Sequence, residues 1–239
     1  MTTQRFYSES HSVGLPDKKV VDAVLQACQV LAAVKLLDVG CGDGAFTLLV
    51  KEVVRAKEVY GIDISQEAVA KGKERGIECC AVDVDEQDLP FPDGFFDMVY
   101  AGAIIEHLVD PDRLLDEIRR VLSPEGVAIA YIPNLAAWYN RLLLLAGYMP
   151  QGTEASLRLP NAGKLFKTTE LGGGHLRIIT LMAFKQLLKN HGFKIVGVKG
   201  VAPPVAALPR PLRLAFSALN SVLCRFPSLA SAMVVVLTK

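Results

Sequence analysis

Three glycines at alternate positions, Gly40, Gly42 and Gly44, follow an apolar run in "LLDVGCGDGAFTLLV" at residues 36–50. Glycine tolerates positive φ and lets a ligand approach the main chain, and the free N–H groups of a helix start favour a polar or anionic group. The spacing indicates a ligand-binding turn, although glycines also serve tight strand-to-helix packing. The spacing is G-x-G-x-G, whereas the dinucleotide fingerprint is G-x-G-x-x-G. The last position of that fingerprint also accepts alanine, and Ala45 stands there, so spacing alone does not exclude a dinucleotide.

Three acidic residues follow apolar runs near this turn. Asp38 would repel a pyrophosphate and attract a cationic ammonium group. Asp63 lies 19 residues after Gly44, where a carboxylate can accept hydrogen bonds from ribose hydroxyls; otherwise it is a solvated loop acid or a helix cap. Asp83 can accept from an exocyclic amine, or is a surface acid in an acidic run.

Alternating strand and helix patterns position these residues. Helices are predicted at 16–33, 45–54, 66–76, 110–122, 180–192 and 211–223, and strands at 34–39, 58–64, 78–84, 97–101, 127–133, 193–201 and 231–239. The alternation predicts an α/β fold, a mainly parallel sheet with helices on both faces.

Composition excludes some classes of partner and compartment. Lys and Arg number 26 against 25 Asp and Glu, so net charge does not favour nucleic acid or an anionic membrane. Five cysteines without a CxxC pair argue against a zinc knuckle and a disulfide framework, and a polar N-terminus lacks a signal sequence. We expect a cytoplasmic protein with no integral membrane association.

Several segments together resemble the class I S-adenosylmethionine-dependent methyltransferases, over residues 36–134. These segments are "LLDVGCGDGAFT", "VYGIDIS", "AVDVDEQDLPFPDGFFDMVYAGAIIEHLVDPDRLLDEIRRVLSPEG" and "YIPN". Two more, "PNLAAWYNRLLLLAGYMP" and "GGHLRIITLMAFKQLLKNHGF", are similar to the MetW-like branch, which is linked to methionine biosynthesis, whereas "EHL" at 106–108 is more typical of general small-molecule methyltransferases.

The resemblance implies a Rossmann-like, seven-stranded sheet with an antiparallel last strand and an insertion after the fifth strand. We expect a single methyltransferase domain over 1–239. Its parts would be a cofactor-binding half at 16–133, an insertion or lid near the acceptor at 134–178, and a segment at 179–239 that completes the sheet.

The resemblance also implies S-adenosylmethionine as cofactor, with S-adenosylhomocysteine as product. Asp38, Gly40 and Gly42 would frame its methionine part, and Gly44 would allow the turn into the helix. Asp63 would hold the ribose, and Ala101 would lie near the amino acid or sulfonium end. The remaining cofactor-binding candidates are Cys41 in the turn, Ile64 packed on the adenine, and Asp83 with Val84 at the adenine amine.

Candidates for the acceptor side follow the fourth strand and lie in the insertion. His107 is the candidate general base, because it follows this strand near the expected methyl group; alternatively it orients the loop with Glu106. His175 can enter the site from a flexible segment or stay in solvent, and Tyr139 can line an acceptor pocket or belong to the core. No metal-ligand spacing such as HExxH is present, so no metal is expected.

The leading hypothesis is an enzyme that methylates a small molecule. The apolar insertion segment "WYNRLLLLAGYMP" suggests that this molecule is apolar. The alternatives are a MetW-like accessory protein that binds cofactor or a partner enzyme without turnover, and an NAD-dependent oxidoreductase. Residues after the fourth strand read "YAGA" rather than Asn or Asp before Pro-Pro, so nucleic acid is not expected as a substrate. Residues 208–237 suggest lipid contact or, more simply, a helix packed on the sheet.

Overall fold

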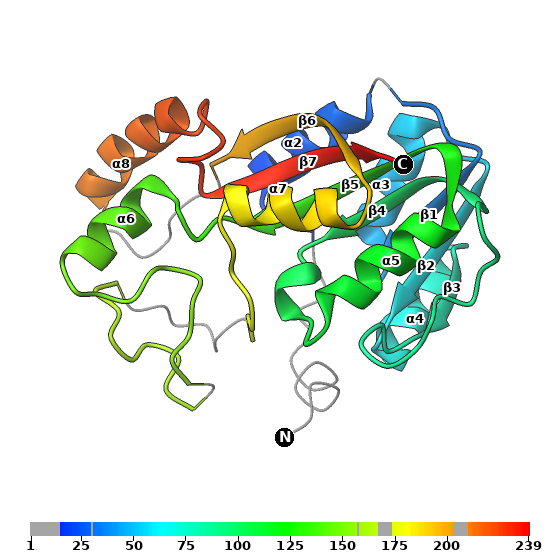
Figure 1. Ribbon diagram of the computed structural model, residues 1–239, viewed down its shortest axis with the longest axis horizontal. Helices are drawn as coiled ribbons and strands as arrows, with labels where there is room; N and C mark the ends of the chain where they lie inside the picture. Colours follow the sequence, from blue (N-terminus) through cyan, green and yellow to red (C-terminus); the bar gives the residue numbers. More distant parts are fainter. Residues whose placement is uncertain (1–14, 30, 157, 167–173, 203–209) are drawn as a thin grey trace.

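The computed structural model describes residues 15–29, 31–156, 158–166, 174–202 and 210–239 (Figure 1). A seven-stranded sheet in the order β3-β2-β1-β4-β5-β7-β6 organises this part of the chain. The strands are β1 (Lys35–Val39), β2 (Glu58–Asp63), β3 (Glu78–Ala81), β4 (Phe96–Gly102), β5 (Leu122–Pro133), β6 (Lys194–Val201) and β7 (Ala232–Thr238).

Strand direction divides the sheet in two. The pairs from β3 to β5 are parallel, whereas β7 runs antiparallel to both β5 and β6. The Rossmann-like sheet and its antiparallel last strand are therefore confirmed. The strand order reverses at β1 and β4, and in such sheets ligands bind outside the carboxyl ends of the strands at this point.

Helices begin where short polar side chains cap the free N–H groups of the first turn. Asp17 caps α2 (Lys18–Cys28), Ser65 caps α4 (Gln66–Glu74), Asp110 caps α5 (Pro111–Val121) and Thr180 caps α7 (Leu181–Asn190). The helix α3 (Ala45–Val54) instead begins at Gly44, whose φ of 77° lies in the left-handed region. Its start is thus determined by the glycine turn.

Helices cover both faces of the sheet, as predicted (Figure 1). On one face, α5 and α7 contribute buried side chains such as Leu114, Leu115, Phe184 and Leu188. On the other, α2 and α3 contribute Val24 and Val50 to a separate cluster of buried side chains. The sheet is therefore buried on both faces, which explains the continuous apolar runs of its strands.

The segment after β5 leaves the sheet. It carries α6 (Trp138–Leu145), which lies beside α8 (Arg210–Leu223) at one end of the molecule (Figure 1). Trp138 stacks on Phe216 with ring centroids 4.9 Å apart, and its indole N–H donates to Asn220 Oδ1 at 3.0 Å. The expectation that α8 packs on the sheet is wrong, because α8 lies beyond the end of the sheet and its Phe216 packs on Trp138 of α6.

Parts of two predicted segments lie outside the described residues. These are residues 157 and 167–173 of the insertion at 134–178, and residues 203–209 of the proline-rich link before α8. The division of the chain into a cofactor-binding half, an insertion and a C-terminal completion stays a prediction.

Candidate active site

A cleft opens at the carboxyl ends of the parallel strands, where the strand order reverses. It has a cavity volume of about 170 Å³ and is lined from several elements, including Gly40 after β1, Asp63 at the end of β2, Asp83 after β3, and His107. The last of these lies in η1 (Ile105–His107), a short 3-10 helix after β4. Residues predicted from separate motifs are thus brought to one site.

The glycine turn folds back onto β2 through main-chain hydrogen bonds. The N–H groups of Gly40 and Cys41 both donate to the carbonyl of Ile62, at 2.8 and 3.0 Å. Gly40 adopts a φ of 78°, and an added Cβ would lie 3.0 Å from Ile104 Cδ1. Glycine at position 40 therefore lets the main chain reach the cleft where a side chain would crowd its wall.

Asp63 connects the turn to the start of α4. Its Oδ2 accepts from Gly42 N and its Oδ1 from Ser65 N, both at 2.9 Å, and the residue is 7% exposed. Each carboxylate oxygen has a second lone pair. Asp63 is therefore both a structural link and an acceptor that can still bind hydroxyl groups in the cleft.

Three predicted residues of the turn, Cys41, Gly42 and Gly44, are not among the residues that line the cleft. An added Cβ on Gly44 would lie 2.4 Å from Ile77 Cδ1 and 3.5 Å from Gly72 Cα, so this glycine permits close packing of α3 against α4. A Cβ added to Gly61 of β2 would lie only 2.7 Å from the Cys41 sulfur, so the thiol packs against this strand. Cys41 and Gly44 therefore support the turn from behind.

Asp38 is also placed beneath the turn rather than in the lining of the cleft. It is 3% exposed, and Thr47 Oγ1 donates to its Oδ2 at 2.5 Å. Burial, opposed by the Thr47 hydrogen bond and helped by the negative charge of Asp63, raises the pKa of Asp38 to about 7. The carboxyl group therefore titrates close to neutral pH.

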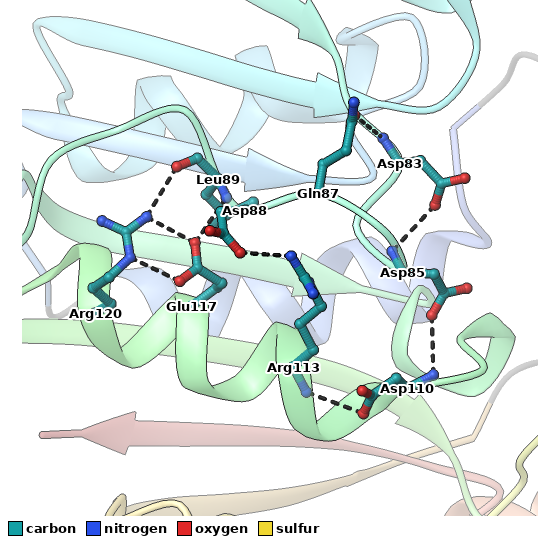
Figure 2. A network of polar contacts seen from close by, with 9 residues as sticks. All are labelled: Asp83, Asp85, Gln87, Asp88, Leu89, Asp110, Arg113, Glu117 and Arg120. Carbon is teal, nitrogen blue, oxygen red and sulfur yellow. Dashed lines mark hydrogen bonds and ion pairs between the residues drawn. The ribbon is translucent and has the colours of Figure 1, made fainter.

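Asp83 and Val84 belong to the connection after β3, which polar contacts tie to α5 (Figure 2). Asp83 Oδ1 accepts from Asp85 N at 3.1 Å, and Asp85 Oδ1 accepts from Val109 N and Asp110 N, each at 3.0 Å. Farther along, Glu117 Oε2 accepts from Leu89 N at 2.7 Å. The wall of the cleft that carries Asp83 is therefore held at both ends.

The fourth strand contributes to the cleft two residues later than predicted. Ala101 is 2% exposed and lies in the core, whereas Ala103 and Ile104 line the cleft. Ala103 has a positive φ of 52°, which is uncommon for a residue other than glycine. Sequence pattern contained no signal for this turn, because alanine is not a residue that such a conformation favours.

At the far end of the cleft, His107 approaches His175, with ring centroids 4.8 Å apart. His107 Nδ1 lies 3.4 Å from the carbonyl of Gly174, and His175 Nδ1 lies 2.8 Å from that of Gly152. The Glu106 carbonyl accepts from the N–H groups of Leu176 and Arg177, at 2.8 and 2.9 Å. The insertion thereby delivers His175 to the site.

Glu106 is a functional candidate that sequence reasoning treated only as a partner of His107. It is 3% exposed, and burial, partly offset by a backbone hydrogen bond, raises its pKa to about 8. Its Oε2 has no hydrogen-bond partner among the described residues. The signal available in the sequence was the pair of polar residues in "IIEHL", between apolar neighbours.

Tyr139 lies elsewhere. Its ring packs between Trp138, with centroids 5.7 Å apart, and Phe216, with centroids 5.6 Å apart, at the junction of α6 and α8. No contact places it with His107 or His175 in the part of the chain that the structure describes. Its predicted role in an acceptor pocket therefore receives no geometric support.

A mainly parallel sheet with a glycine turn and carboxylates at the ends of successive strands is the arrangement in which α/β proteins bind nucleotide-like ligands. The family model described as "Methyltransferase domain" matches residues 37–130. The demethylmenaquinone methyltransferase of Staphylococcus aureus strain JH9 is 36% identical over 197 residues, which cover 77% of this chain and 78% of that protein. The chain belongs to the class I S-adenosylmethionine-dependent methyltransferases.

Two further similarities agree with this family. The chloroplastic 2-methyl-6-phytyl-1,4-hydroquinone methyltransferase of Arabidopsis thaliana is 38% identical over 110 residues, 45% of this chain and 32% of that one. A crystal structure of an S-adenosylmethionine-dependent methyltransferase from Mesorhizobium loti shares the fold, with a TM-score of 0.59, 19% identity, and coverage of 91% and 96% of the two chains. These relatives do not support the predicted likeness to the MetW-like branch.

The enzyme class and the cofactor S-adenosylmethionine are thus confirmed, and the NAD alternative does not agree with the family. The site fits this cofactor: the Gly40 main chain is accessible in the cleft, Asp63 offers acceptor lone pairs, and Ile64 and Val84 provide apolar walls. No helix within the described ranges has the length and apolar character needed to cross a bilayer.

Proposed function

We propose that this enzyme methylates a reduced quinone or a related hydroxylated ring, held at the His107 end of the cleft. Both curated relatives described above carry quinone or hydroquinone substrates in their names. The observation that carries the proposal is the cleft itself, because it connects the acidic strand ends to His107 across apolar side chains, Ile104 and Leu108. An aromatic ring fits such walls.

The cofactor side of this cleft is assigned by proximity. Asp63 would accept from the ribose hydroxyls through its remaining lone pairs, and Asp83 would accept from the adenine amine, with Ile64 and Val84 packed on the adenine ring. Gly40 and Gly42 would present the main chain to the methionine part. Asp38, Cys41, Gly44 and Ala101 would act from behind, by supporting the turn and the floor of the site.

The chemistry required of the chain is alignment and removal of one proton. When bound, S-adenosylmethionine supplies a methyl group on a positively charged sulfur, which is already an activated leaving group. The cleft would hold the acceptor in line with that methyl group and exclude water. The hydroxyl proton of the acceptor would leave toward His107, so that a ring carbon could form the new bond to the methyl carbon as the sulfur–methyl bond breaks. The hydrogen on that ring carbon would then be lost as a proton while the ring oxygen regains one, so that one proton is released overall.

An exposed apolar face suggests how a water-insoluble acceptor reaches the cleft. Leu145 of α6 is 88% exposed and Leu214 of α8 is 78% exposed, and they are accompanied by Leu142, Leu144, Leu219 and Val222. Neither α6 nor α8 contains Asp or Glu, and Arg141 of α6 and Arg225, which follows α8, are exposed. We infer that this α6–α8 face contacts an anionic lipid surface, where apolar burial and charge attraction act together.

A direct assay tests the proposed acceptor. Purified enzyme is incubated with methyl-labelled S-adenosylmethionine and a demethylated quinone under reducing conditions, and the labelled lipid-soluble product is identified by mass spectrometry. The same quinone kept oxidised is the matched control, because it has no hydroxyl proton to lose. Methyl transfer to the reduced form alone is the expected result; transfer to neither form, by enzyme that binds S-adenosylhomocysteine, contradicts the proposed acceptor class.

A further inference from the structure

Three potential metal ligands converge at the acceptor end of the cleft. Glu106, His107 and His175 each offer one ligand atom, and these atoms all lie within 4.8 Å of one another. Metal–ligand bonds to histidine nitrogen and carboxylate oxygen are about 2.0–2.2 Å long, so ligand atoms around a tetrahedral ion lie about 3.4 Å apart. The widest pair would therefore need to close by about 1.4 Å.

The histidines are oriented as metal ligands usually are. His175 Nδ1 lies 2.8 Å from the Gly152 carbonyl, and His107 Nδ1 lies 3.4 Å from the Gly174 carbonyl. A neutral imidazole that donates to a carbonyl through one nitrogen carries a lone pair on the other nitrogen, and such an outer hydrogen bond fixes the ring for coordination.

Glu106 supplies an independent observation. Its side chain is buried at 3% exposure, and Oε2 has no hydrogen-bond partner among the described residues. A buried carboxyl oxygen without a partner is costly, and it is tolerated where a cation completes its environment. The Glu106 carbonyl also accepts from Leu176 N and Arg177 N, so the segment that carries His175 is bound to the main chain of Glu106.

We propose that Glu106, His107 and His175 bind a divalent transition-metal ion, with Zn²⁺ as the first candidate. Two histidines and one carboxylate form a known catalytic zinc ligand set that leaves a coordination position open. Because His107 lines the cleft, an ion that it binds would lie at the edge of the cleft. The expectation of no metal came from local spacing, whereas 68 residues separate His107 from His175.

The role of the ion rests on the proposed function, although its binding does not. An acceptor hydroxyl that coordinates the ion has a lowered pKa, as metal-bound water does. With the ion bound, the hydroxyl proton would pass to solvent water, because His107 is then a ligand; His107 would act as the base only in the metal-free enzyme. The ion is not consumed and undergoes no change of oxidation state.

The test is metal titration of the full chain after removal of bound metal by chelation. Zn²⁺ binding is measured by calorimetry in wild type, in Glu106→Gln and His175→Gln, and in His191→Gln as a control outside the cluster. We expect each ligand substitution to weaken binding by at least about 100-fold, since outer-shell changes alone cost 10–100-fold. The control variant should bind as wild type does.

Two further readouts distinguish this site from other causes. Co²⁺ bound by nitrogen and oxygen should give visible absorption bands without the near-ultraviolet thiolate band that coordination by Cys41 or Cys79 would produce. Zn²⁺ should raise the melting temperature of wild type and not of Glu106→Gln, which keeps the size of the side chain but lacks the carboxylate that would bind the ion.

Absence of Zn²⁺ and Co²⁺ binding by wild type, or unchanged binding in both ligand variants, overturns the proposal. S-adenosylhomocysteine binding and metal-free methyl transfer are measured on the same preparations. If cofactor binding and methyl transfer persist while no metal binds, the proposed function stands and the metal site does not. If metal binds but no quinol is methylated, the metal site stands and the proposed acceptor class is wrong.

Discussion

The two halves of this enzyme differ in how their functional residues are brought together. From β1 to β5, the carboxylates of the cleft lie at or just after the ends of β2 and β3, and main-chain N–H groups donate to them. After residue 133, the contribution to the site is His175, which reaches His107 through contacts between distant segments.

Charge and exposure also change along the chain. The 25 acidic residues all lie within residues 1–170, and the face of α6 and α8 exposes large apolar side chains. In the proposed function, the first half would bind the cofactor and the second half would select the acceptor. The following experiments would break or sharpen this contrast.

The largest expected effect is loss of cofactor binding in Asp63→Ala. The substitution removes the carboxylate that accepts from Gly42 N and Ser65 N at 2.9 Å, together with the proposed acceptors for the ribose. Hydrogen bonds to a charged group contribute about 1.5–3 kcal/mol each, so affinity for S-adenosylhomocysteine should fall by about 100-fold or more. Titration calorimetry measures the affinity.

Two variants control this experiment. Asp63→Asn retains the shape and one acceptor oxygen, which separates misfolding from loss of binding. Asp88→Ala removes an exposed partner of Arg113 in the same half of the chain, and its affinity should be unchanged. Wild-type affinity in a folded Asp63→Ala protein would remove this carboxylate from the cofactor site.

The glycine turn provides a matched pair of stability variants. Gly44→Ala places a Cβ 2.4 Å from Ile77 Cδ1 at a positive φ, whereas Gly42→Ala places one in open space at a positive φ. Left-handed backbone costs about 1–2 kcal/mol for alanine, and overpacking adds about 1–3 kcal/mol. Chemical denaturation should therefore show the larger loss in Gly44→Ala; equal losses would show that packing of α3 on α4 does not require this glycine.

The α6–α8 face is tested with vesicles that contain anionic phospholipid. The double variant Leu145→Glu with Leu214→Glu replaces the most exposed leucines of the two helices, and vesicle binding measured by sedimentation should fall by about tenfold or more. Met182→Glu, on α7 at 72% exposure, is the control and should bind as wild type does. If wild type binds neutral and anionic vesicles equally weakly, the α6–α8 face does not contact an anionic lipid surface.

The smallest effect expected is a pH-dependent contribution of His191. Burial lowers the pKa of His191, but hydrogen bonds and charge from Asp116 and Asp112 outweigh it, so the pKa is raised above 6.5. Stabilisation by the protonated ring should be complete below pH 6.5 and lost as pH rises through the raised value. Both aspartates are largely exposed, so the contribution is about 1 kcal/mol or less.

Denaturation of wild type and His191→Gln at pH 6 and pH 9 measures this contribution. The difference in unfolding free energy between the two proteins should be larger at pH 6, and a larger difference at pH 9 would reverse the assigned sign.

The sequence alone predicted the parts of this enzyme that depend on local spacing. The seven strands, their flanking helices and the antiparallel β7 follow from apolar periodicity and the family motifs, and Gly40, Asp63 and Asp83 line one cleft because parallel strands end at the same edge. Such features are read within a few residues of chain, where backbone geometry determines which side chain faces which way.

The tertiary structure decided the remainder, because it depends on contacts between residues far apart in the sequence. Cys41 and Gly44 face packed elements rather than the cleft, and α8 packs on α6 through Trp138 rather than on the sheet. The approach of His175 to His107 and Glu106 across 68 residues also lies beyond any local pattern. Periodicity specifies that a face is buried, whereas only packing specifies what buries it.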